Sequence, residues 1–426
     1  MTSTPAPDRR SAGVGLVLML ALLAMIGPFT IDTIFPGFGA IADELDVTAP
    51  ALQQTISVYL VSLALMSLLH GPLSDAFGRR PVIIASCAAY AVTAVACALA
   101  PSFGLLLVAR AAQGVFAGAG TIVGRAMIRD LLDASAAQRL LSQVTMVFGA
   151  APAVAPIVGG LLVPYGWRTI FWFLAALGAG LALAATFGLR ESLPEQDRQP
   201  FRAGTVIRSV ARRYRDLPTT VLAVATGLNF GAMFLYISSA PAIVEGLLGR
   251  GEQDYWVLFV PMIGGLVVGS YVAGRLGGRT TPGRIATLGL AISLVTGLGN
   301  VVYAALAGDV ALPWAVVGPS LTSFGIALTF PVMILAILDR APGNARGAAA
   351  SVQAFTQLIM GAVISSVVSP AVSGSGLGLA ATALSLTVGA ALLWTWHVLT
   401  RRRTLRAQAR ARRTGAHAAE SPAESC

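Results

Sequence analysis

Charged residues are scarce in this sequence. Asp, Glu, Lys and Arg make up only 11% of its 426 residues, whereas a soluble domain carries about a quarter. Hydrophobic residues account for 56% of the chain, and the mean hydropathy is +0.76. Because a water-soluble fold could not bury this much apolar surface, the composition excludes an ordinary soluble protein and indicates a chain that lipid surrounds.

Lysine is missing altogether, so the net charge of +10 comes from 29 arginines against 19 acidic residues. The arginines stand in short clusters between apolar runs, which is where membrane topology places positive charge. This placement does not favour a nucleic-acid surface. We therefore expect a lipid bilayer, and no nucleic acid, to be the partner of the basic residues.

Cysteine and histidine are also few, with three of each. Cys87, Cys97 and Cys426 have neither the spacing of metal ligands nor that of a disulfide framework. The sequence also lacks a phosphate-binding P-loop and a Ser/His/Asp arrangement at one membrane depth. We expect no metal, no other cofactor and no enzymatic activity, so a membrane enzyme is the least favoured class.

Long apolar runs dominate the sequence. Twelve of them lie at approximately 14–36, 51–72, 81–100, 103–126, 141–163, 167–189, 219–244, 254–276, 283–306, 311–337, 346–370 and 376–399. Each is long enough to cross a bilayer, and the polarity of the backbone requires that it cross as a helix. The sequence thus predicts an all-α membrane protein of twelve transmembrane helices in two pseudo-symmetric six-helix bundles.

The arginines also predict the orientation. Loops on one side hold 26 of them and loops on the other side only two, Arg168 and Arg250, which places both termini and the central loop in the cytoplasm. The chain then divides into a cytoplasmic N-terminus (1–13), a first bundle (14–189), a central loop (190–218), a second bundle (219–399) and a disordered basic tail (400–426). Residues 207–215 could form either a basic amphipathic helix on the anionic leaflet or a solvated linker.

The turn after the second span carries the strongest local pattern. Residues 71–80 read Gly-Pro-Leu-Ser-Asp-Ala-Phe-Gly-Arg-Arg, and a weaker copy joins the eighth and ninth spans at 269–279. The pattern resembles the signature of the major facilitator superfamily, G-x-L-S-D-x-x-G-R-R. The resemblance implies a tight turn that helps to close the cytoplasmic side and governs switching. We assign this cytoplasmic latch to Gly71, Asp75, Gly78, Arg79 and Arg80.

The fourth span contains an arginine, Arg110, that shares a helical face with Gln113. An arginine inside a span is costly unless it is paired or hydrated, so it marks a functional site. The pattern resembles the R-x-x-Q-G motif that the superfamily associates with proton coupling. Asp32, the only acid embedded in an apolar run, is the expected partner of Arg110. The two residues form either a proton-coupling pair or a permanent structural ion pair.

The fifth span is rich in small residues and proline, at Gly149, Pro152, Pro156, Gly159 and Gly160. Small residues permit close helix contact, and two prolines bend a helix. The segment resembles the antiporter motif of drug:proton exporters, G-x-x-x-G-P-x-x-G-G, although Ala155 replaces the glycine before Pro156. The resemblance implies export.

Two further segments resemble Bcr/CflA-type drug-resistance exporters. They are Asp-Thr-Ile-Phe-Pro at 32–36 and Tyr-Ile-Ser-Ser-Ala-Pro at 236–241. The expected substrate contacts are apolar or uncharged side chains of the second, seventh and eleventh spans. They are Tyr59, Asn229, Phe230, Met233, Tyr236, Gln353 and Gln357.

These patterns together predict a cell (inner) membrane protein that exports small amphipathic drugs in exchange for protons and acts as a monomer. Two alternatives remain on the same fold: a proton-coupled transporter of one metabolite, and a transporter-like receptor. Rocking of the two halves about a midplane site is the expected mechanism.

Overall fold

The computed structural model describes residues 14–132, 134–277, 279–307, 310–340 and 346–419, and in these ranges the regular structure is helical. The first half comprises α1 (Val14–Asp32), η1 (Phe35–Gly37), α2 (Phe38–Leu45), α3 (Ala49–Phe77), α4 (Arg79–Ala98), α5 (Phe103–Ala117), α6 (Ala119–Leu131), α7 (Ala134–Leu162), η2 (Val163–Tyr165) and α8 (Arg168–Gly188). The central loop holds η3 (Glu195–Asp197) and α9 (Ala203–Tyr214). The second half comprises α10 (Leu217–Ser238), η4 (Ala242–Leu247), α11 (Trp256–Leu276), α12 (Pro282–Ala307), α13 (Trp314–Asp339), α14 (Arg346–Val363), η6 (Ile364–Val368), α15 (Ser369–Val372) and α16 (Gly376–Ala419).

The predicted spans are confirmed. Eleven helical segments are long and apolar enough to cross a membrane. The remaining predicted span, 141–163, falls within α7, where residues 151–165 form a shorter apolar helix. The first span is longer than expected, because α1, η1 and α2 follow one another from Gly15 to Leu45. The fourth span is α5 followed by α6, with a break at Gly118.

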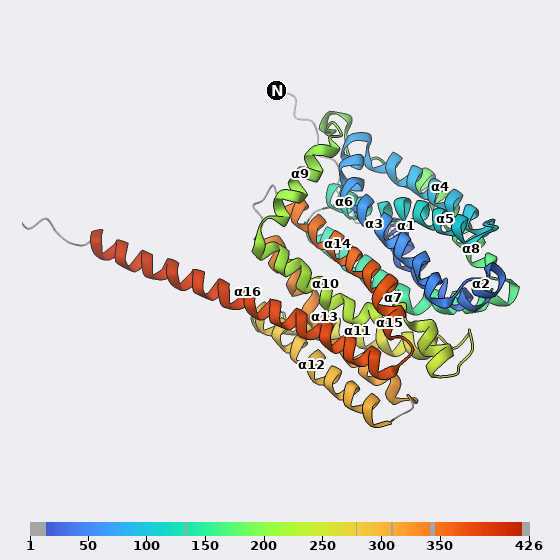
Figure 1. Ribbon diagram of the computed structural model, residues 1–426. Helices are drawn as coiled ribbons and strands as arrows, with labels where there is room; N and C mark the ends of the chain where they lie inside the picture. The colour runs from blue at the N-terminus through green and yellow to red at the C-terminus, as the bar shows by residue number, and fades with distance from the viewer. Residues whose placement is uncertain (1–13, 133, 278, 308–309, 341–345, 420–426) are drawn as a thin grey trace, which may run out of the picture.

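The helices pack as two bundles that lie against each other (Figure 1). In the first, α4 packs on α8 and α5, α3 on α5, and α1 on α7. In the second, α13 packs between α11 and α12, and α16 packs on α10 and α12. The bundles meet along α3 and α14 and along α7 and α11.

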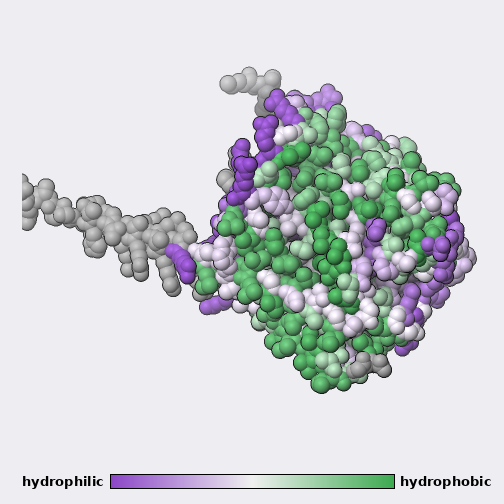
Figure 2. Space-filling model, in the orientation of Figure 1, coloured by the Kyte–Doolittle hydropathy of each residue, from purple (hydrophilic) through white to green (hydrophobic). Residues whose placement is uncertain are grey.

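The outer surface is apolar over the middle of the molecule and polar at its two ends (Figure 2). Large apolar side chains on this surface, such as Val92, Val108, Leu183 and Val295, are more than 60% exposed. Such a belt is stable only against lipid, so it is the membrane-facing surface.

The tail differs from its prediction. Residues 400–419, which we expected to be disordered, continue α16 beyond the bundles (Figure 1). The reason is local composition, because this stretch consists mainly of arginine, alanine and other strong helix formers and contains no proline. Residues 420–426 lie outside the described part of the chain.

Residues 207–214, which we expected to form either an amphipathic helix on the leaflet or a solvated linker, are helical. They belong to α9, which contacts α3 of the first bundle and α10 and α14 of the second. Val210 is buried in this contact, and the Tyr214 hydroxyl bonds with that of Thr356 at 2.6 Å. The central loop is therefore packed against both halves on the cytoplasmic side.

Candidate functional site

Asp32 is the last residue of α1, and η1 begins three residues later at Phe35. Its side chain is 2% exposed and makes no hydrogen bond or ion pair with any residue that the structure describes. The neighbouring hydroxyls are already used, since Thr30 donates to the Ile26 carbonyl and Thr33 to the Phe29 carbonyl. An isolated buried carboxylate is costly, so this environment stabilises the neutral acid over the charged one.

Arg110 is fully buried in α5. Its Nη1 donates to Gln113 Oε1 at 2.7 Å, and its Nε donates to the Thr55 carbonyl at 3.3 Å. The guanidinium carbon lies 4.7 Å from the centre of the Tyr59 ring, a cation–π distance. Nη1 also donates to the Thr30 carbonyl of α1 at 3.5 Å, so Arg110 is held by a neutral amide, two carbonyls and aromatic faces. Its Nη2 is left without a partner.

The expected ion pair between Asp32 and Arg110 is not formed, and this part of the prediction is wrong for the state that the structure describes. No salt bridge between described residues joins the two side chains. Gln113 is the nearer acceptor, because it lies one helical turn away on the same face. Tyr59 is the shared neighbour, since its phenol group lies near both side chains.

Three of the residues assigned to the latch, Asp75, Arg79 and Arg80, lie together, with Arg79 at the centre. Arg79 Nη1 lies 2.5 Å from Asp75 Oδ1, and Arg79 Nε lies 3.2 Å from Asp130 Oδ2. Arg80 donates to the Thr186 carbonyl at 2.6 Å. These bonds join α3, α4, α6 and α8 within the first half. These side chains thus form one network, and among the described residues no hydrogen bond or ion pair of this network reaches the second half.

The turn in the latch is smaller than expected. α3 continues through Gly71 to Phe77, and only Gly78 has positive φ, at 99°. A side chain on Gly71 would meet open space, so no close contact there requires glycine. Gly71 therefore has no structural role in the turn, and Gly78 has it alone.

Two acids of the latch are found by the structure and not by the pattern. The Glu191 carboxylate accepts the backbone N–H groups of Arg79 and Arg80 at 3.0 and 3.2 Å, which caps the start of α4. Asp130 accepts from Arg79 and from Ser192. The signal available in the sequence was weak: each is an acid at a cytoplasmic helix end among arginines.

The two halves are joined on the outer side of the membrane, away from the cytoplasm. Gln53 Nε2 donates to the Ser238 carbonyl at 2.8 Å, and Ser365 donates to Gln53 Oε1 at 3.1 Å. The Tyr255 hydroxyl lies 3.1 Å from the Phe35 carbonyl oxygen. We call these five residues the outer gate. Among the described residues, hydrogen bonds between the two bundles lie at this end, so the outer side is closed.

The glycines of the fifth span explain how this side closes. A Cβ on Gly159 would overlap the Thr33 carbonyl oxygen, and one on Gly160 would lie 2.9 Å from the Glu252 carbonyl oxygen. Gly159 therefore admits the segment after Asp32, and Gly160 admits a loop of the second half. Pro152 and Pro156 lie within α7. The surroundings of Gly149 lie outside the described side chains.

The predicted substrate contacts fall in three places. Tyr59 is fully buried beside Arg110, and its hydroxyl donates to the Gly27 carbonyl at 3.0 Å. Tyr236 and Asn229 are buried, and the Tyr236 hydroxyl accepts from Asn300 Nδ2 at 2.9 Å inside the second bundle. In this state Tyr59 and Tyr236 therefore pack within their own halves, and each has a polar partner there.

The other candidates lie on α10 and α14, which pack together. Phe230 stacks on Phe234 with ring centres 5.6 Å apart. Gln353 donates to Gln357 Oε1 at 2.7 Å on α14, next to the half-buried Thr356. Met233 is 7% exposed. These residues form an apolar surface with two linked amides, which suits an amphipathic molecule.

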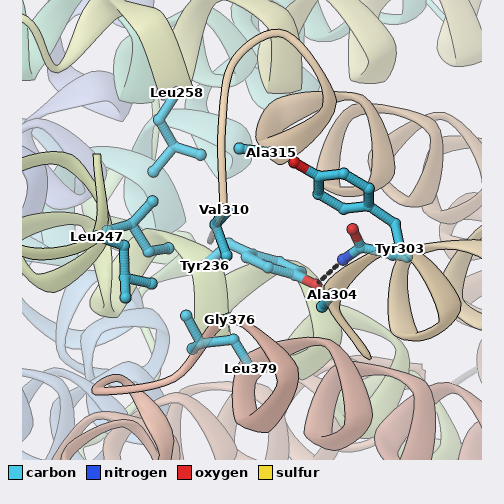
Figure 3. Close-up of a pocket in the computed structure, with 11 residues that line it drawn as sticks. Tyr236, Leu247, Leu258, Tyr303, Ala304, Val310, Ala315, Gly376 and Leu379 are labelled. Atoms are coloured by element: carbon cyan, nitrogen blue, oxygen red, sulfur yellow. Dashed lines mark hydrogen bonds between the residues drawn. The ribbon is translucent and has the colours of Figure 1, made fainter. Parts of the chain in front are cut away.

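A cavity in the second bundle is too small to hold a drug (Figure 3). Its volume is about 30 Å³, and Tyr236, Asn300, Tyr303 and Leu379 are among its lining residues. Drug-sized ligands need roughly 300–1,000 Å³, whereas this space suits about one water molecule. The cavity is therefore a packing gap around the Tyr236–Asn300 bond.

Comparison with known proteins places this arrangement among transporters. The family model described as Major Facilitator Superfamily matches residues 19–365. The chain is 30% identical over 373 residues to the uncharacterized MFS-type transporter YdgK of Bacillus subtilis strain 168, covering 86% of this chain and 91% of that protein. It is 27% identical over 360 residues to the bicyclomycin resistance protein homolog of Haemophilus influenzae, covering 82% and 88%.

Two solved structures have the same fold at low sequence identity. A bacterial homolog of the human lysosomal transporter Spinster aligns with a TM-score of 0.71 at 15% identity, over 94% of this chain and 99% of that chain. A D-xylose–proton symporter aligns with a TM-score of 0.70 at 14% identity, over 89% and 96%.

Proposed function

Because the chain belongs to the major facilitator superfamily, and so is a non-enzymatic, multi-pass transporter of the inner membrane, we propose that it exports small amphipathic toxicants in exchange for protons. Relatives at 27–28% identity carry the names bicyclomycin resistance protein homolog and multidrug resistance protein. These names support a drug as the substrate class.

The observation that carries the proton part of the proposal is the isolation of Asp32. It is a buried acid without a partner among the described residues, in the state whose outer side is closed. A neutral Asp32 is stable there, whereas a charged one requires water or a cation. The proton therefore binds Asp32 before the outer side closes and leaves when the cytoplasmic side admits water.

Arg110 supplies the positive charge of the same half. Its bonds to Gln113 and to the Thr55 carbonyl fix it within 4.7 Å of the Tyr59 ring. When Asp32 loses its proton, the nearby guanidinium stabilises the carboxylate across Tyr59. Proton loss thus changes the charge inside the first half. Because the outward-closed and inward-closed states then bind the proton with different affinities, protonation can shift the equilibrium between them.

The substrate site that we propose lies along α10 and α14, of which α14 packs on α3 of the first half. It joins the stacked Phe230 and Phe234 to the Gln353–Gln357 pair. Aromatic faces bind apolar drugs of many shapes, and the two amides supply hydrogen bonds without a fixed charge.

A drug panel on an efflux-deficient strain tests the substrate class. Cells that express the protein are expected to tolerate at least one amphipathic antibiotic better than cells with an empty vector. If tolerance to all compounds is unchanged while vesicles show proton-coupled flux of one nutrient, the protein is a metabolite transporter. If no solute moves with protons, the receptor interpretation gains support.

Drug-driven proton release from purified protein tests the role of Asp32. We expect drug addition to release protons from the wild type and to release none from Asp32→Asn. Asp43→Asn is the matched control, because Asp43 is exposed near the same membrane face, and it should behave as the wild type. Proton release that persists unchanged in Asp32→Asn would refute the assignment.

A further inference from the structure

A second acid stands at the outer gate, in the half opposite Asp32. Glu245 lies in η4, and its Oε1 is 2.8 Å from the Tyr255 hydroxyl oxygen. The same hydroxyl lies 3.1 Å from the Phe35 carbonyl oxygen of the first half. Tyr255 is fully buried and Glu245 is half-buried. Tyr255 is thus a bridge between a titratable group and a backbone carbonyl that belongs to the other bundle.

The number of hydrogens decides what this bridge can do. A tyrosine hydroxyl has one hydrogen to donate, while a carboxylate and a carbonyl oxygen are both acceptors. If Glu245 is charged, the hydroxyl donates to the carboxylate, which is the stronger acceptor, and the Phe35 carbonyl loses its donor. If Glu245 is protonated, it donates to the Tyr255 oxygen, and the hydroxyl is free to donate to Phe35. Both short distances are satisfied together only in the protonated form.

The surroundings of Glu245 contain other acids and no described cation in contact with it. Glu252, on the loop before Tyr255, is the acid that acts on Glu245, and Asp254 accepts the Gly251 N–H at 3.2 Å. Arg250 is exposed, and its backbone N–H donates to the Val244 carbonyl. The described parts of η1 and residues 151–162 of α7 add no charged group, and the one charged residue of α11, Arg275, lies in its last turn, at the end away from Tyr255. Burial, together with the charge of Glu252, raises the pKa of Glu245 above its ordinary range, and the Tyr255 bond offsets part of this rise.

We propose that Glu245 is a second proton-binding residue of this transporter, and that its proton holds the outer gate closed through Tyr255 and the Phe35 carbonyl. The proposal deepens the proton exchange argued above and rests on it for its place in the cycle. In an exporter driven by protons, the proton-loaded protein is the form that closes to the outside after releasing its drug. A gate that closes on protonation gives the cycle this direction.

The sign of the pH effect follows from linkage. The closed gate binds the Glu245 proton more tightly than the open gate, in which water surrounds the carboxylate. Closure is therefore fully favoured at pH values below the ordinary pKa of glutamate. The advantage is lost as the pH rises through the higher pKa of the closed state.

A spin-label distance across the outer side tests the proposal without drug or flux. Labels are placed at Tyr165→Cys in the first half and Leu306→Cys in the second, which are 80% and 82% exposed. The full chain carries Cys426→Ser, and it is measured in lipid nanodiscs from mildly acidic to alkaline pH. Asp32→Asn is included in the background, so that the remaining pH response belongs to another group.

Glu245→Gln is the diagnostic variant, because its amide stays neutral and still donates to the Tyr255 oxygen. We expect it to show the short, closed distance at every pH, whereas the parent opens as the pH rises. Tyr255→Phe should lose the pH response as well, with a larger open fraction, because the link to Phe35 is gone. Glu252→Gln is the matched control and should keep the response with a lower midpoint.

A pH response that survives unchanged in Glu245→Gln or in Tyr255→Phe would overturn the proposal. The two variants are independent, so one remains informative if the other fails to fold. The spin-label distance does not depend on drug transport. Failure of drug export in the strain assay would therefore refute the proposed substrate class and leave the gating role of Glu245 untouched.

Discussion

Gly160 offers a direct test of how the outer side closes. In the structure its Cα faces the loop of the second half, and an added Cβ would lie 2.9 Å from the Glu252 carbonyl oxygen and 3.3 Å from Gln253 Cα. Both atoms belong to the backbone, so no flexible side chain can move aside. Gly160→Ala therefore inserts a methyl group into a contact between the two halves.

The size of the effect follows from this overlap. Overpacking by one methyl group costs about 1–3 kcal/mol, and this cost falls on the state in which the halves touch at this point. A difference of that size changes the ratio of closed to open forms by about five- to 150-fold. Alanine also favours a helix over glycine by up to about 1 kcal/mol, but that gain applies to both states and cancels in the ratio.

The assay is the spin-label distance between positions 165 and 306 at fixed acidic pH, where the parent is expected to be closed. Gly160→Ala should shift the distance distribution toward the open form. Gly264→Ala in α11 is the matched control, because nothing lies within 4 Å of its added Cβ, and it should leave the distribution unchanged. An unchanged distribution in Gly160→Ala would refute the idea that this glycine admits the opposing loop.

Three further predictions concern the latch and the buried polar groups. Gly78→Ala should lower the free energy of unfolding by about 1–3 kcal/mol because φ is 99° at this position, whereas Gly71→Ala, with open space around it, should not lower the melting temperature, because alanine favours the helix. Arg110→Lys should abolish drug-driven proton release, because an ammonium cannot reproduce the fork of bonds that the guanidinium makes; release at the wild-type rate would contradict this. Tyr236→Phe should lower the free energy of unfolding by about 0.5–1.5 kcal/mol through loss of the Asn300 bond and leave drug affinity unchanged, and a weaker affinity would show that Tyr236 contacts the drug.

Much of the fold could be predicted from the sequence, because lipid imposes simple demands. A span needs a long apolar run and must be helical, and arginine clusters mark the cytoplasmic loops. The latch could be predicted for a similar reason. Asp75 and Arg79 are four residues apart at the junction of two helices, and the structure joins them at 2.5 Å. Local spacing determines these features, so they do not depend on how distant helices cross.

The partners of buried charged groups could not be predicted in this way. The sequence offers one embedded acid, Asp32, and one embedded base, Arg110, and the pattern suggested that they meet. Which acceptor an arginine finds depends on the packing of helices around it, and here Gln113 on its own helix and the Thr55 carbonyl of α3 are nearer. Glu245 was overlooked because it follows a span. Its chemistry depends on Tyr255, which also bonds to the Phe35 carbonyl over a separation of 220 residues.

The segment after Asp32 connects the features that matter for transport. The Phe35 carbonyl, three residues after Asp32, accepts from the Tyr255 hydroxyl. The Thr33 carbonyl, one residue after Asp32, packs on Gly159. A charge on Asp32 requires water or a cation at the end of α1. If Asp32 and Glu245 have the proposed roles, hydrating this point displaces the segment that holds both contacts, and loss of the Asp32 proton weakens the outer gate from the first half. Loss of the Glu245 proton then weakens the same bond from the second half, so the Tyr255–Phe35 contact is where the two proposed protonation events act together.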